Sequence, residues 1–462
     1  MATAFSVPEL DFELLSRYGV AGPRYTSYPT APQFTEAFTG ADLLQEIHRS
    51  DRLDNPPPLS LYFHLPFCES VCFYCGCNVT FTADRSRPAA YLKTLYREMD
   101  LLRPQLSANR EVVQLHWGGG TPTFFAPQEL GELIAAIKER FLFSADSELG
   151  IEVDPRETNA EHLKVLGKAG FNRLSVGIQD FDDDVQRAVN RIQSEEQTRA
   201  VIEEGRANGM RSVSVDLMYG LPKQSRASFV RTLDRVLALA PDRLALFNFA
   251  YLPEMIRHQK AIKPEELPSP QEKLAIFRYA VERLLGEGYV YIGMDHFAKA
   301  DDDLCRAQRE GNLYRNFQGY STHAGCDLLA FGVSSISSLG RVYAQNHKNI
   351  HQYTDAINAA KPATARGLLL NDDDLLRREI IMRLMCDFEL DIGKVETQFG
   401  IKFAEYFASS LTSLEDMQRD GLLTVGSDKI VVLPTGRFLI RNIAMCFDAY
   451  LKAGQNRFSK TV

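Results

Sequence analysis

Four cysteines lie within ten residues of the segment HLPFCESVCFYCGCN, which covers residues 64–78. They are Cys68, Cys72, Cys75 and Cys77, so their spacing is C-x3-C-x2-C-x-C. Cysteine thiolates bind zinc or iron–sulfur clusters. A structural zinc site usually has two cysteine pairs separated by a longer spacer, and no second C-x2-C pair follows in this chain. The spacing therefore favours an iron–sulfur cluster over zinc.

The number of ligands decides what such a cluster can do. A cube held by four thiolates transfers electrons, whereas a cube held by three keeps one iron open to a further ligand. If the loop is extended after Cys75, the side chain of Cys77 is carried to the opposite face. This argument favours Cys68, Cys72 and Cys75 as the three metal ligands, with four ligands as the alternative.

The composition is that of an ordinary globular protein, with 45% hydrophobic and 24% charged residues. The net charge of -8 does not suit a nucleic-acid partner. The segment MATAFSVPELDFELLSRYG lacks the features of a signal peptide, and no long apolar run suggests a membrane span. We therefore expect a cytoplasmic protein with reduced thiols. The remaining cysteines are expected to be small buried residues: Cys305, Cys326, Cys386 and Cys446.

Short β-rich segments alternate with helical segments from Pro58 onward, which predicts βα units and a parallel sheet. Polar residues near the ends of these segments are expected at the carboxyl edge of the sheet, where parallel α/β folds place their chemistry. In the first segment, Tyr62 and His64 share a polar face just before the cysteines. The expected strands lie within residues 59–66, 112–123, 149–155, 173–181, 212–222, 243–253 and 289–298. The polar residues are His116, Glu152, Gln179, Asp180, Asp216, Asn248, Asp295 and His296.

The composition and the predicted secondary structure change twice along the sequence, which predicts three parts. Residues 1–57 are a polar, proline-punctuated arm with a short helix near residues 41–50, and residues 58–370 form the βα catalytic domain. Residues 371–462 are mostly helical, with Asn371 or Asp372 as the first N-cap and a hairpin before the last helix, as in a winged helix. This part carries 12 Lys/Arg against 14 Asp/Glu, so we expect a structural or lid role rather than DNA binding.

The C-x3-C-x2-C motif, with an aromatic residue just before its third cysteine, resembles the signature of the radical S-adenosylmethionine (radical SAM) enzymes. The resemblance implies a partial (β/α)6 barrel and a 4Fe–4S cluster whose open iron binds S-adenosylmethionine. One electron then splits the cofactor into methionine and a 5′-deoxyadenosyl radical. The segment WGGGTPT, after the second expected strand, is similar to the glycine-rich segment that receives the amino group of S-adenosylmethionine, with a plain tight turn as the alternative.

A narrower resemblance runs almost from end to end. The segments PRYTSYPTAP, YFHLPFCESVCFYCGCN, LHWGGGTPT, IEVDPRE, GFNRLSVGIQDF, DLMYGLPKQ, IGMDHFA, RNFQGY and GRFLIRNIAMCFD together resemble the oxygen-independent coproporphyrinogen III oxidase family. That resemblance implies oxidative decarboxylation of two propionates of coproporphyrinogen III to vinyl groups in haem biosynthesis, begun by hydrogen abstraction at the propionate carbon next to the ring. It also implies two molecules of S-adenosylmethionine, a reductase or flavodoxin-type electron donor, and a monomer without nucleic-acid or membrane partners.

Individual residues are carried over from the family by position. Cys68, Cys72 and Cys75 match its cluster ligands, and Cys77 matches a cysteine that is not a ligand. Residues that match contacts of the first S-adenosylmethionine are Tyr62, Gly119, Glu152 and Ile336. Residues that match contacts of the second are Tyr74, where a phenylalanine is expected, Gly120, Thr121, Gln179, Arg191, Asp216 and Ala250. The carboxylates suit ribose hydroxyls or an amino group, and the guanidinium of Arg191 suits a carboxylate.

The four propionates of such a substrate should meet cationic groups. Candidates are Arg24, Arg309, Arg315 and Arg441, with an ordinary ion pair as the alternative for each. We also expect the arm and the C-terminal helices to close over the macrocycle and to exclude water. The main alternative function is a haem carrier or chaperone related to this family; an iron–sulfur electron carrier and a winged-helix regulator explain less of the sequence.

Overall fold

The computed structural model describes residues 12–451, and these divide into two compact units. Residues 34–268 and 325–369 form the barrel unit. Residues 12–33, 269–324 and 370–451 form the split unit, named for its three separate segments. The expected arm is thus divided between the units, and the three domain boundaries given above remain a prediction.

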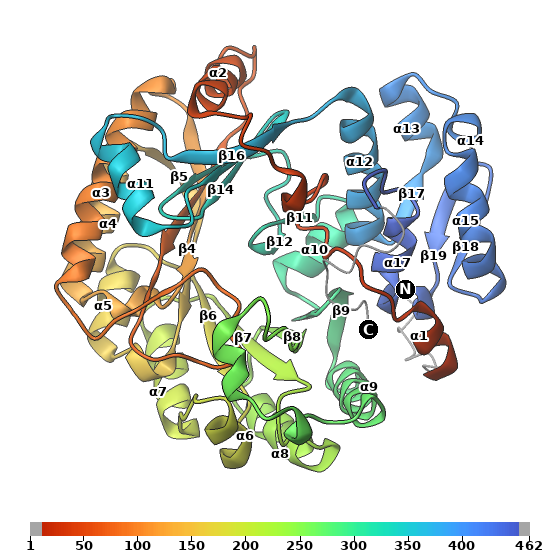
Figure 1. Ribbon diagram of the computed structural model, residues 1–462, viewed down its shortest axis with the longest axis horizontal. Coiled ribbons are helices and arrows are strands. Elements are labelled where there is room, and N and C mark those ends of the chain that lie inside the picture. The colour runs from red at the N-terminus through yellow and green to blue at the C-terminus, as the bar shows by residue number, and fades with distance from the viewer. Residues whose placement is uncertain (1–11, 452–462) are drawn as a thin grey trace. The chain divides into compact units, whose positions relative to one another are not determined.

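A parallel sheet forms the centre of the barrel unit, with helices along its outer side (Figure 1). Neighbouring strands pair in parallel in the order β1 (Leu59–Leu65), β4 (Glu111–Gly119), β5 (Leu142–Val153), β6 (Arg173–Gln179), β7 (Ser212–Tyr219) and β8 (Arg243–Asn248). The helices that alternate with them are α3 (Arg87–Leu102), α4 (Pro127–Arg140), α5 (Ala160–Lys168), α6 (Asp183–Ala188), α7 (Glu195–Ala207) and α8 (Arg226–Leu237). The partial (β/α)6 barrel expected from the sequence is confirmed.

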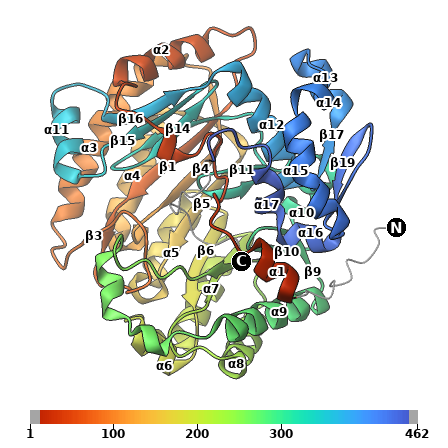
Figure 2. The ribbon, with the colours of Figure 1, turned by 45° about the vertical axis from the view of Figure 1, so that its right-hand side comes forward.

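Further strands extend this sheet beyond β1. Strand β13 (Asp327–Phe331) pairs with β1 in parallel, and β14 (Ile336–Leu339), β15 (Val342–Asn346) and β16 (Thr364–Leu369) follow in antiparallel order. The unit also holds α2 (Gly40–Asp51), the helix expected near residues 41–50, and α11 (Ile350–Asn358) (Figure 2).

The pleat of the strands decides which side chains face the site. On β7, Val215 and Leu217 are fully buried, and Asp216 between them points to the other face. On β5, the half-buried Glu152 lies in the same way between Ile151 and Val153. Apolar packing of one face therefore directs the acidic side chains of both strands to the other.

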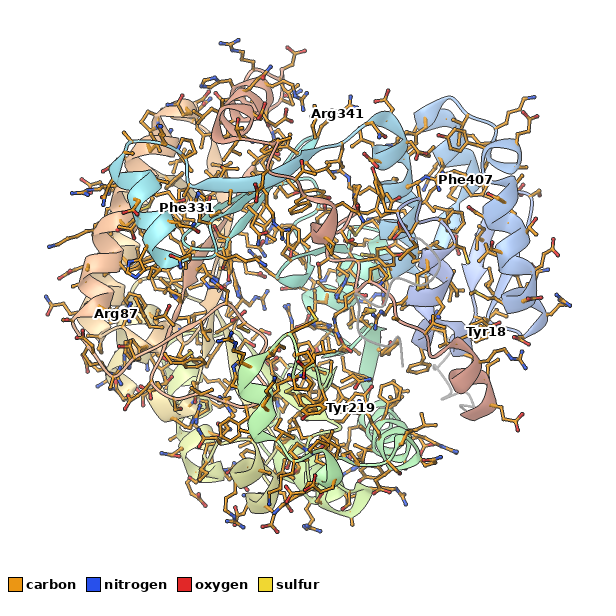
Figure 3. All side chains as sticks on the ribbon, viewed as in Figure 1. Tyr18, Arg87, Tyr219, Phe331, Arg341 and Phe407 are labelled. Carbon is orange, nitrogen blue, oxygen red and sulfur yellow. The ribbon has the colours of Figure 1, made fainter. Side chains whose placement is uncertain are left out.

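Large aromatic side chains fill the core of each unit. In the barrel unit, Phe331 is fully buried and its ring stacks on Phe63 with centroids 4.7 Å apart (Figure 3). In the split unit, Phe407 is 1% exposed and packs against Phe403 and Phe447, at centroid distances of 5.0 and 5.6 Å. Each unit thus has an apolar core of its own.

A buried carboxylate, Glu98 on α3, ties this helix to later segments of the barrel unit. Its Oε2 accepts hydrogen bonds from the Gly332 N–H at 2.7 Å and the Tyr353 hydroxyl at 2.6 Å, and its Oε1 accepts one from Asn346 Nδ2 at 2.7 Å. Burial raises the pKa of Glu98 to about 7, although these donors oppose the rise. The carboxyl group therefore titrates near neutral pH.

Replacing Tyr353 by phenylalanine is expected to lower the free energy of unfolding by about 1–2 kcal/mol, because the ionised carboxylate loses one of its donors. The loss should be larger above pH 7 than below it, since that donor stabilises the charged form of Glu98. Urea unfolding followed by circular dichroism at the two pH values measures both effects. An equal loss at both pH values would contradict the assignment of the ionised form.

The C-terminal part of the split unit is helical with a small sheet. Its N-cap is Asn371, whose side chain accepts the Asp374 N–H, as the sequence indicated. The expected single last helix is instead two short ones, α16 (Pro434–Phe438) and α17 (Ile440–Met445). The elements before them are α12 (Asp372–Asp387), α13 (Ile392–Phe399), α14 (Phe403–Tyr406), α15 (Ala408–Arg419) and the sheet β17 (Glu389–Asp391), β19 (Lys429–Val432), β18 (Leu423–Val425).

The start of the described chain packs against this helical part within the split unit. After α1 (Phe12–Tyr18), Arg441 Nε donates to the carbonyl of Pro23 at 2.9 Å, and the Tyr25 hydroxyl donates to Asp448 at 2.9 Å. Tyr25 and Tyr28 are each only 1% exposed. Residues from the two ends of the sequence thus share one core.

The seventh expected strand segment, residues 289–298, is not a further βα unit. Strands β9 (Tyr289–Gly293) and β10 (His296–Lys299) form an antiparallel hairpin in the split unit. The chain turns at Gly293 (φ 144°) and Met294 (φ 54°), so Asp295 and His296 lie at this turn rather than at the end of a parallel strand. Residues 269–324 of the split unit also include α9 (Pro270–Gly286), α10 (Asp303–Glu310) and the hairpin β11 (Tyr314–Asn316), β12 (Gly319–Ser321).

Across residues 12–451, no helix combines the length and the apolar character that spanning a membrane would require.

Candidate active site

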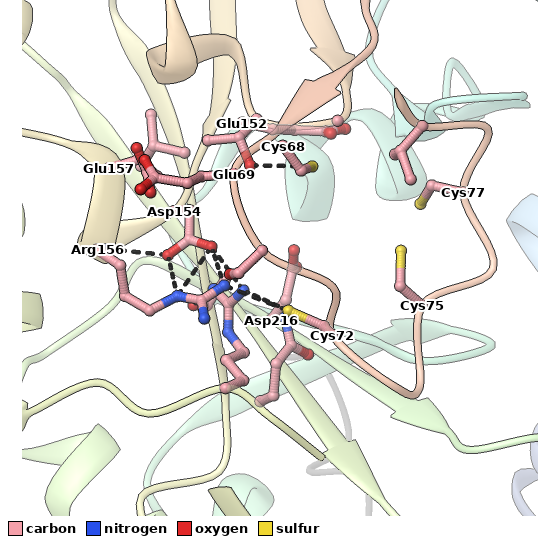
Figure 4. Close-up of a pocket in the computed structure, with 18 of the residues that line it drawn as sticks. Cys68, Glu69, Cys72, Cys75, Cys77, Glu152, Asp154, Arg156, Glu157 and Asp216 are labelled. Atoms are coloured by element: carbon pink, nitrogen blue, oxygen red, sulfur yellow. Dashed lines mark hydrogen bonds and ion pairs between the residues drawn. The ribbon is translucent and has the colours of Figure 1, made fainter. Parts of the chain in front are cut away.

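A pocket lies in the barrel unit at the carboxyl ends of β4 to β7, next to the cysteine loop (Figure 4). Most of the residues predicted from the sequence line it: Cys68, Cys72, Tyr74, Cys75, Gly119, Gly120, Thr121, Glu152, Gln179, Arg191 and Asp216. The pocket is also lined by residues that the prediction did not include, among them Glu69, Cys77, Asp154, Arg156, Glu157, Ser175 and Gly177. Tyr62, Ala250 and Ile336 are predicted site residues that do not line it.

These three residues lie on other parts of the barrel unit. Tyr62 is on β1, where its ring stacks on His116 with centroids 6.1 Å apart. Ala250 follows β8 and its carbonyl accepts a hydrogen bond from Gln259 at 3.2 Å, while Ile336 begins β14. Their assignment as cofactor contacts remains a prediction.

The hydrogen bonds of His64 fix its tautomer. Its Nε2 lies 2.9 Å from the carbonyl of Asn78, so Nε2 carries the proton and donates it. Its Nδ1 then accepts the hydroxyl of Tyr62 at 3.1 Å. Burial lowers the pKa of His64, which keeps the ring neutral. Tyr62 and His64 therefore support the cysteine loop through Asn78.

The cysteine loop is held by bonds from outside it. The Phe73 N–H donates to Val189 at 2.9 Å, and Asn190 Nδ2 donates to the carbonyl of Val71 at 2.8 Å. His258 Nε2 lies 2.5 Å from the carbonyl of Cys75. At its two ends, β2 (Phe67–Cys68) pairs with β3 (Thr80–Phe81). The loop is thus positioned by the barrel and not by its own sequence alone.

The four thiols have different surroundings. Cys68 Sγ lies 3.4 Å from the hydroxyl of Thr121, and burial raises the pKa of the Cys68 thiol to about 12. Cys77 does not point away from Cys75 as the extended-loop argument expected: both thiols line the pocket and face each other (Figure 4). The hydrogen bond from Cys77 lowers the pKa of Cys75. The choice of three ligands over four remains a prediction.

The donor set fits a cluster better than a single ion. Among residues 12–451, no three Cys, His, Asp or Glu side chains converge as one metal ion would require. In an iron–sulfur cube each thiolate binds a different iron, so the ligands surround a volume instead of one point. The thiols of the three predicted ligands line one pocket together with that of Cys77, which matches that demand.

The glycine triplet gives space to three different neighbours. A Cβ on Gly118 would lie 2.8 Å from the carboxyl carbon of Glu152, and a Cβ on Gly119 would lie 2.6 Å from the ring of His64. A Cβ on Gly120 would lie 2.7 Å from backbone atoms just before Cys68. Gly119 also has a φ of 114°, which favours glycine. The triplet is therefore more than a tight turn.

Three acidic residues of the pocket have pKa values that are shifted in different directions. Glu152 accepts hydrogen bonds from the Gly119 N–H at 3.3 Å and pairs with His116 at 3.1 Å, which lowers its pKa despite its burial. For Asp216, burial and the nearby charge of Glu152 raise the pKa to about 7. For Asp154, Arg191 and Arg156 outweigh burial and lower the pKa to about 2.

The sequence and the whole fold match known proteins. The radical SAM superfamily model matches residues 62–236, and the HemN C-terminal domain model matches residues 370–439. Curated relatives from Pseudomonas aeruginosa and Escherichia coli (strain K12), both named oxygen-independent coproporphyrinogen III oxidase, are 47% identical to this chain. Those alignments cover 98% and 99% of this chain, and 98% and 100% of the relatives.

The chain belongs to the oxygen-independent coproporphyrinogen III oxidase family. A solved structure described as coproporphyrinogen III oxidase (HemN) from Escherichia coli, a radical SAM enzyme, is 46% identical, with a TM-score of 0.92. That match covers 96% of this chain and 100% of the other. Membership of this family makes the chain a radical SAM oxidoreductase, and the cofactors of these enzymes are a 4Fe–4S cluster and S-adenosylmethionine.

Its pocket suits that cofactor pair. S-adenosylmethionine carries a sulfonium, an amino group, a carboxylate and ribose hydroxyls. The oxidase offers the carboxylates of Glu152 and Asp216, the guanidinium of Arg191 and the exposed backbone of Gly119 and Gly120. Each kind of group has a chemical counterpart in the pocket.

The four candidate arginines of this family member lie in the split unit. Arg315 is 2% exposed and donates to the Arg24 carbonyl at 3.3 Å, and Arg441 is 6% exposed. Arg24 forms an ion pair with Asp295, and Arg309 donates to the carbonyl of Ala300 at 3.3 Å. The buried pair, Arg315 and Arg441, holds the backbone of residues 22–24, which favours a structural role for them.

The affinity of the oxidase for S-adenosylmethionine is expected to rise with pH through about 7, because Asp216 is a predicted cofactor contact whose carboxyl group can attract the cofactor's positive groups only when it is ionised. In Asp216→Asn the affinity should be lower and this rise should be absent. Binding is measured by equilibrium dialysis with the cluster-loaded protein across this pH range. An equal rise in the variant would show that another group causes it.

Proposed function

We propose that the protein oxidises coproporphyrinogen III without oxygen, converting two propionate side chains to vinyl groups to give protoporphyrinogen IX in haem biosynthesis. The observation that carries the proposal is the pocket of the barrel unit. It brings four thiols, a glycine backbone, five acidic side chains and two guanidiniums together at the carboxyl edge of the sheet. The full-length match to oxidases of this name supports the substrate.

We assign the following roles within the pocket. Cys68, Cys72 and Cys75 would hold the 4Fe–4S cluster, which when reduced supplies the electron that generates a 5′-deoxyadenosyl radical from S-adenosylmethionine. Glu152, already bonded to the Gly119 N–H, orients the cofactor's amino group. Arg191, whose side chain lines the pocket, pairs with a cofactor carboxylate.

A second S-adenosylmethionine is part of the proposal. The lining residues that would contact it are Tyr74, Gly120, Thr121, Gln179, Arg191 and Asp216. Two cofactor molecules match the two propionates to be oxidised, since one radical removes one hydrogen atom. Each propionate then loses carbon dioxide and one electron, which passes to an electron acceptor, to leave the vinyl group. Arg24 and Arg309 remain the candidates for the propionates of the substrate.

We also propose that the protein is a cytoplasmic monomer that receives single electrons from a reductase or flavodoxin-type donor. All eight cysteines are free thiols, which suits a reducing compartment. The cluster needs an external electron for each cofactor molecule cleaved, so an electron donor is required.

One anaerobic experiment tests the function. The full chain is reconstituted with iron and sulfide, and then given a reductant, S-adenosylmethionine and coproporphyrinogen III. We expect protoporphyrinogen and 5′-deoxyadenosine to form together, with carbon dioxide released. Tight haem binding without either product would overturn the proposal in favour of a haem carrier.

A further inference from the structure

Two arginines, the buried Arg191 and the partly buried Arg156, bridge one carboxylate and one cysteine sulfur in the pocket. Asp154 Oδ2 accepts from Arg156 Nη2 and from Arg191 Nη1, each at 2.7 Å. The same two nitrogen atoms approach Cys72 Sγ, at 3.2 Å for Arg156 and 3.6 Å for Arg191 (Figure 4). The side chains of Asp154 and Arg191 are 7% and 8% exposed, and that of Arg156 is 17% exposed.

The hydrogen bonds from these two guanidiniums go to Cys72. The sulfur of Cys68 meets the hydroxyl of Thr121 at 3.4 Å, and the sulfur of Cys75 faces the thiol of Cys77. Among the three predicted cluster ligands, Cys72 is thus the one with hydrogen bonds from charged donors in the described structure. Arg156 was not among the residues expected from the sequence.

Charged hydrogen-bond donors to a ligand sulfur change the reduction potential of a cluster. Reduction adds a negative charge that is spread over the iron and sulfur atoms, including the cysteine sulfurs. A guanidinium hydrogen bond stabilises this more negative state, and does so more strongly where water is largely excluded. Asp154 offsets one of the two positive charges and fixes the position of both guanidiniums.

We propose that Arg156, with Arg191, raises the reduction potential of the cluster held at Cys72, and that Asp154 positions both guanidiniums and limits the size of this effect. The inference rests on the proposed role of Cys72 as a cluster ligand. It concerns the step in which the cluster receives its electron, before the cofactor is cleaved. Arg156 is therefore a residue that tunes the cluster through Cys72, and Asp154 is a positioning residue.

The test is a redox titration of the reconstituted full-length protein in the absence of S-adenosylmethionine, followed by the EPR signal of the reduced cluster. In Arg156→Gln, the equilibrium constant for one-electron reduction should fall about tenfold, which is about 59 mV for a one-electron couple. In Asp154→Asn, it should rise, because two guanidiniums then act without their counter-charge.

The matched control is Arg85→Gln. Arg85 also lies beside the pocket, where it pairs with Glu157 at 2.9 Å, but its side chain is 50% exposed and its hydrogen bonds go to Glu69, Glu157 and the carbonyl of Phe124. The charge change is the same as in Arg156→Gln, so a general charge effect would appear in both. We expect the potential of Arg85→Gln to stay close to that of the wild type.

Iron and sulfide content and the absorbance of the oxidised cluster confirm that each variant is loaded. If Arg156→Gln does not load, Arg156→Lys replaces it, because lysine keeps the charge but loses the planar donors and should still lower the potential. A potential in the Arg156 variant equal to that of Arg85→Gln, or shifts of the same sign in the Arg156 and Asp154 variants, would overturn the inference. Cluster assembly that survives in Cys72→Ser would instead overturn the ligand assignment on which it rests.

Discussion

Cys68→Ser should leave the protein unable to hold a 4Fe–4S cluster, and coproporphyrinogen turnover should fall to background. Iron in such clusters prefers soft thiolate ligands, and a serine hydroxyl is a much poorer donor. The other two predicted ligands, Cys72 and Cys75, are too few to hold a cube firmly. Iron and sulfide per chain, with the EPR spectrum after reduction, measure the cluster directly and separately from turnover.

Cys77→Ser is the matched control, since the exchange is the same and the residue belongs to the same loop. Its thiol lines the pocket and forms a hydrogen bond with Cys75, so its position is compatible with a role as a fourth ligand. We expect Cys77→Ser to assemble a cluster with normal iron content. Loss of the cluster in this variant as well would mean that four cysteines hold it.

The second large effect is expected in Gly119→Ala. The added methyl group would lie 2.6 Å from the ring of His64, and the residue would have to keep a φ of 114°. Moving His64 disturbs its bonds to Tyr62 and Asn78, and moving the backbone takes the Gly119 N–H away from Glu152. We expect the free energy of unfolding to fall by about 2–3 kcal/mol and the affinity for S-adenosylmethionine to fall at least tenfold, or ~1.4 kcal/mol.

Gly209→Ala separates these causes. Gly209 has a similar φ of 96°, but a Cβ there would meet nothing within 4 Å. It should therefore show only the backbone cost of about 1 kcal/mol and unchanged cofactor affinity. Denaturant unfolding and equilibrium dialysis apply to both variants. Equal behaviour of the two would mean that close packing around Gly119 has no role.

The parallel part of the barrel was predictable because its strands alternate buried apolar residues with residues that face the site. Val215 and Leu217 around Asp216 are an example of this pattern. Residues 289–298 are a similar mixture of apolar and polar residues, yet the chain reverses direction at Gly293 and Met294 and forms a hairpin. Nothing local distinguishes a strand that continues into a helix from one that forms a hairpin with residues just beyond it.

The site was predictable where the residue type itself carries the chemistry, as for the cysteines, the glycines and Glu152. Asp154 was within reach of the same reasoning, since it follows Glu152 by two residues and so shares its face. Arg156 was not, because its contact with Cys72 joins residues 84 positions apart. The orientation of Cys77 likewise depends on a loop that the barrel positions from outside.

The shared core of the split unit has a consequence for synthesis on the ribosome. Tyr25 and Tyr28 are made more than four hundred residues before their partners Asp448 and Ala449. The barrel unit ends at residue 369, so its strands and the cysteine loop have all emerged while the early tyrosines still lack their partners. A nascent chain that stops before residue 440 would lack these partners of the two tyrosines even with an intact cysteine pocket.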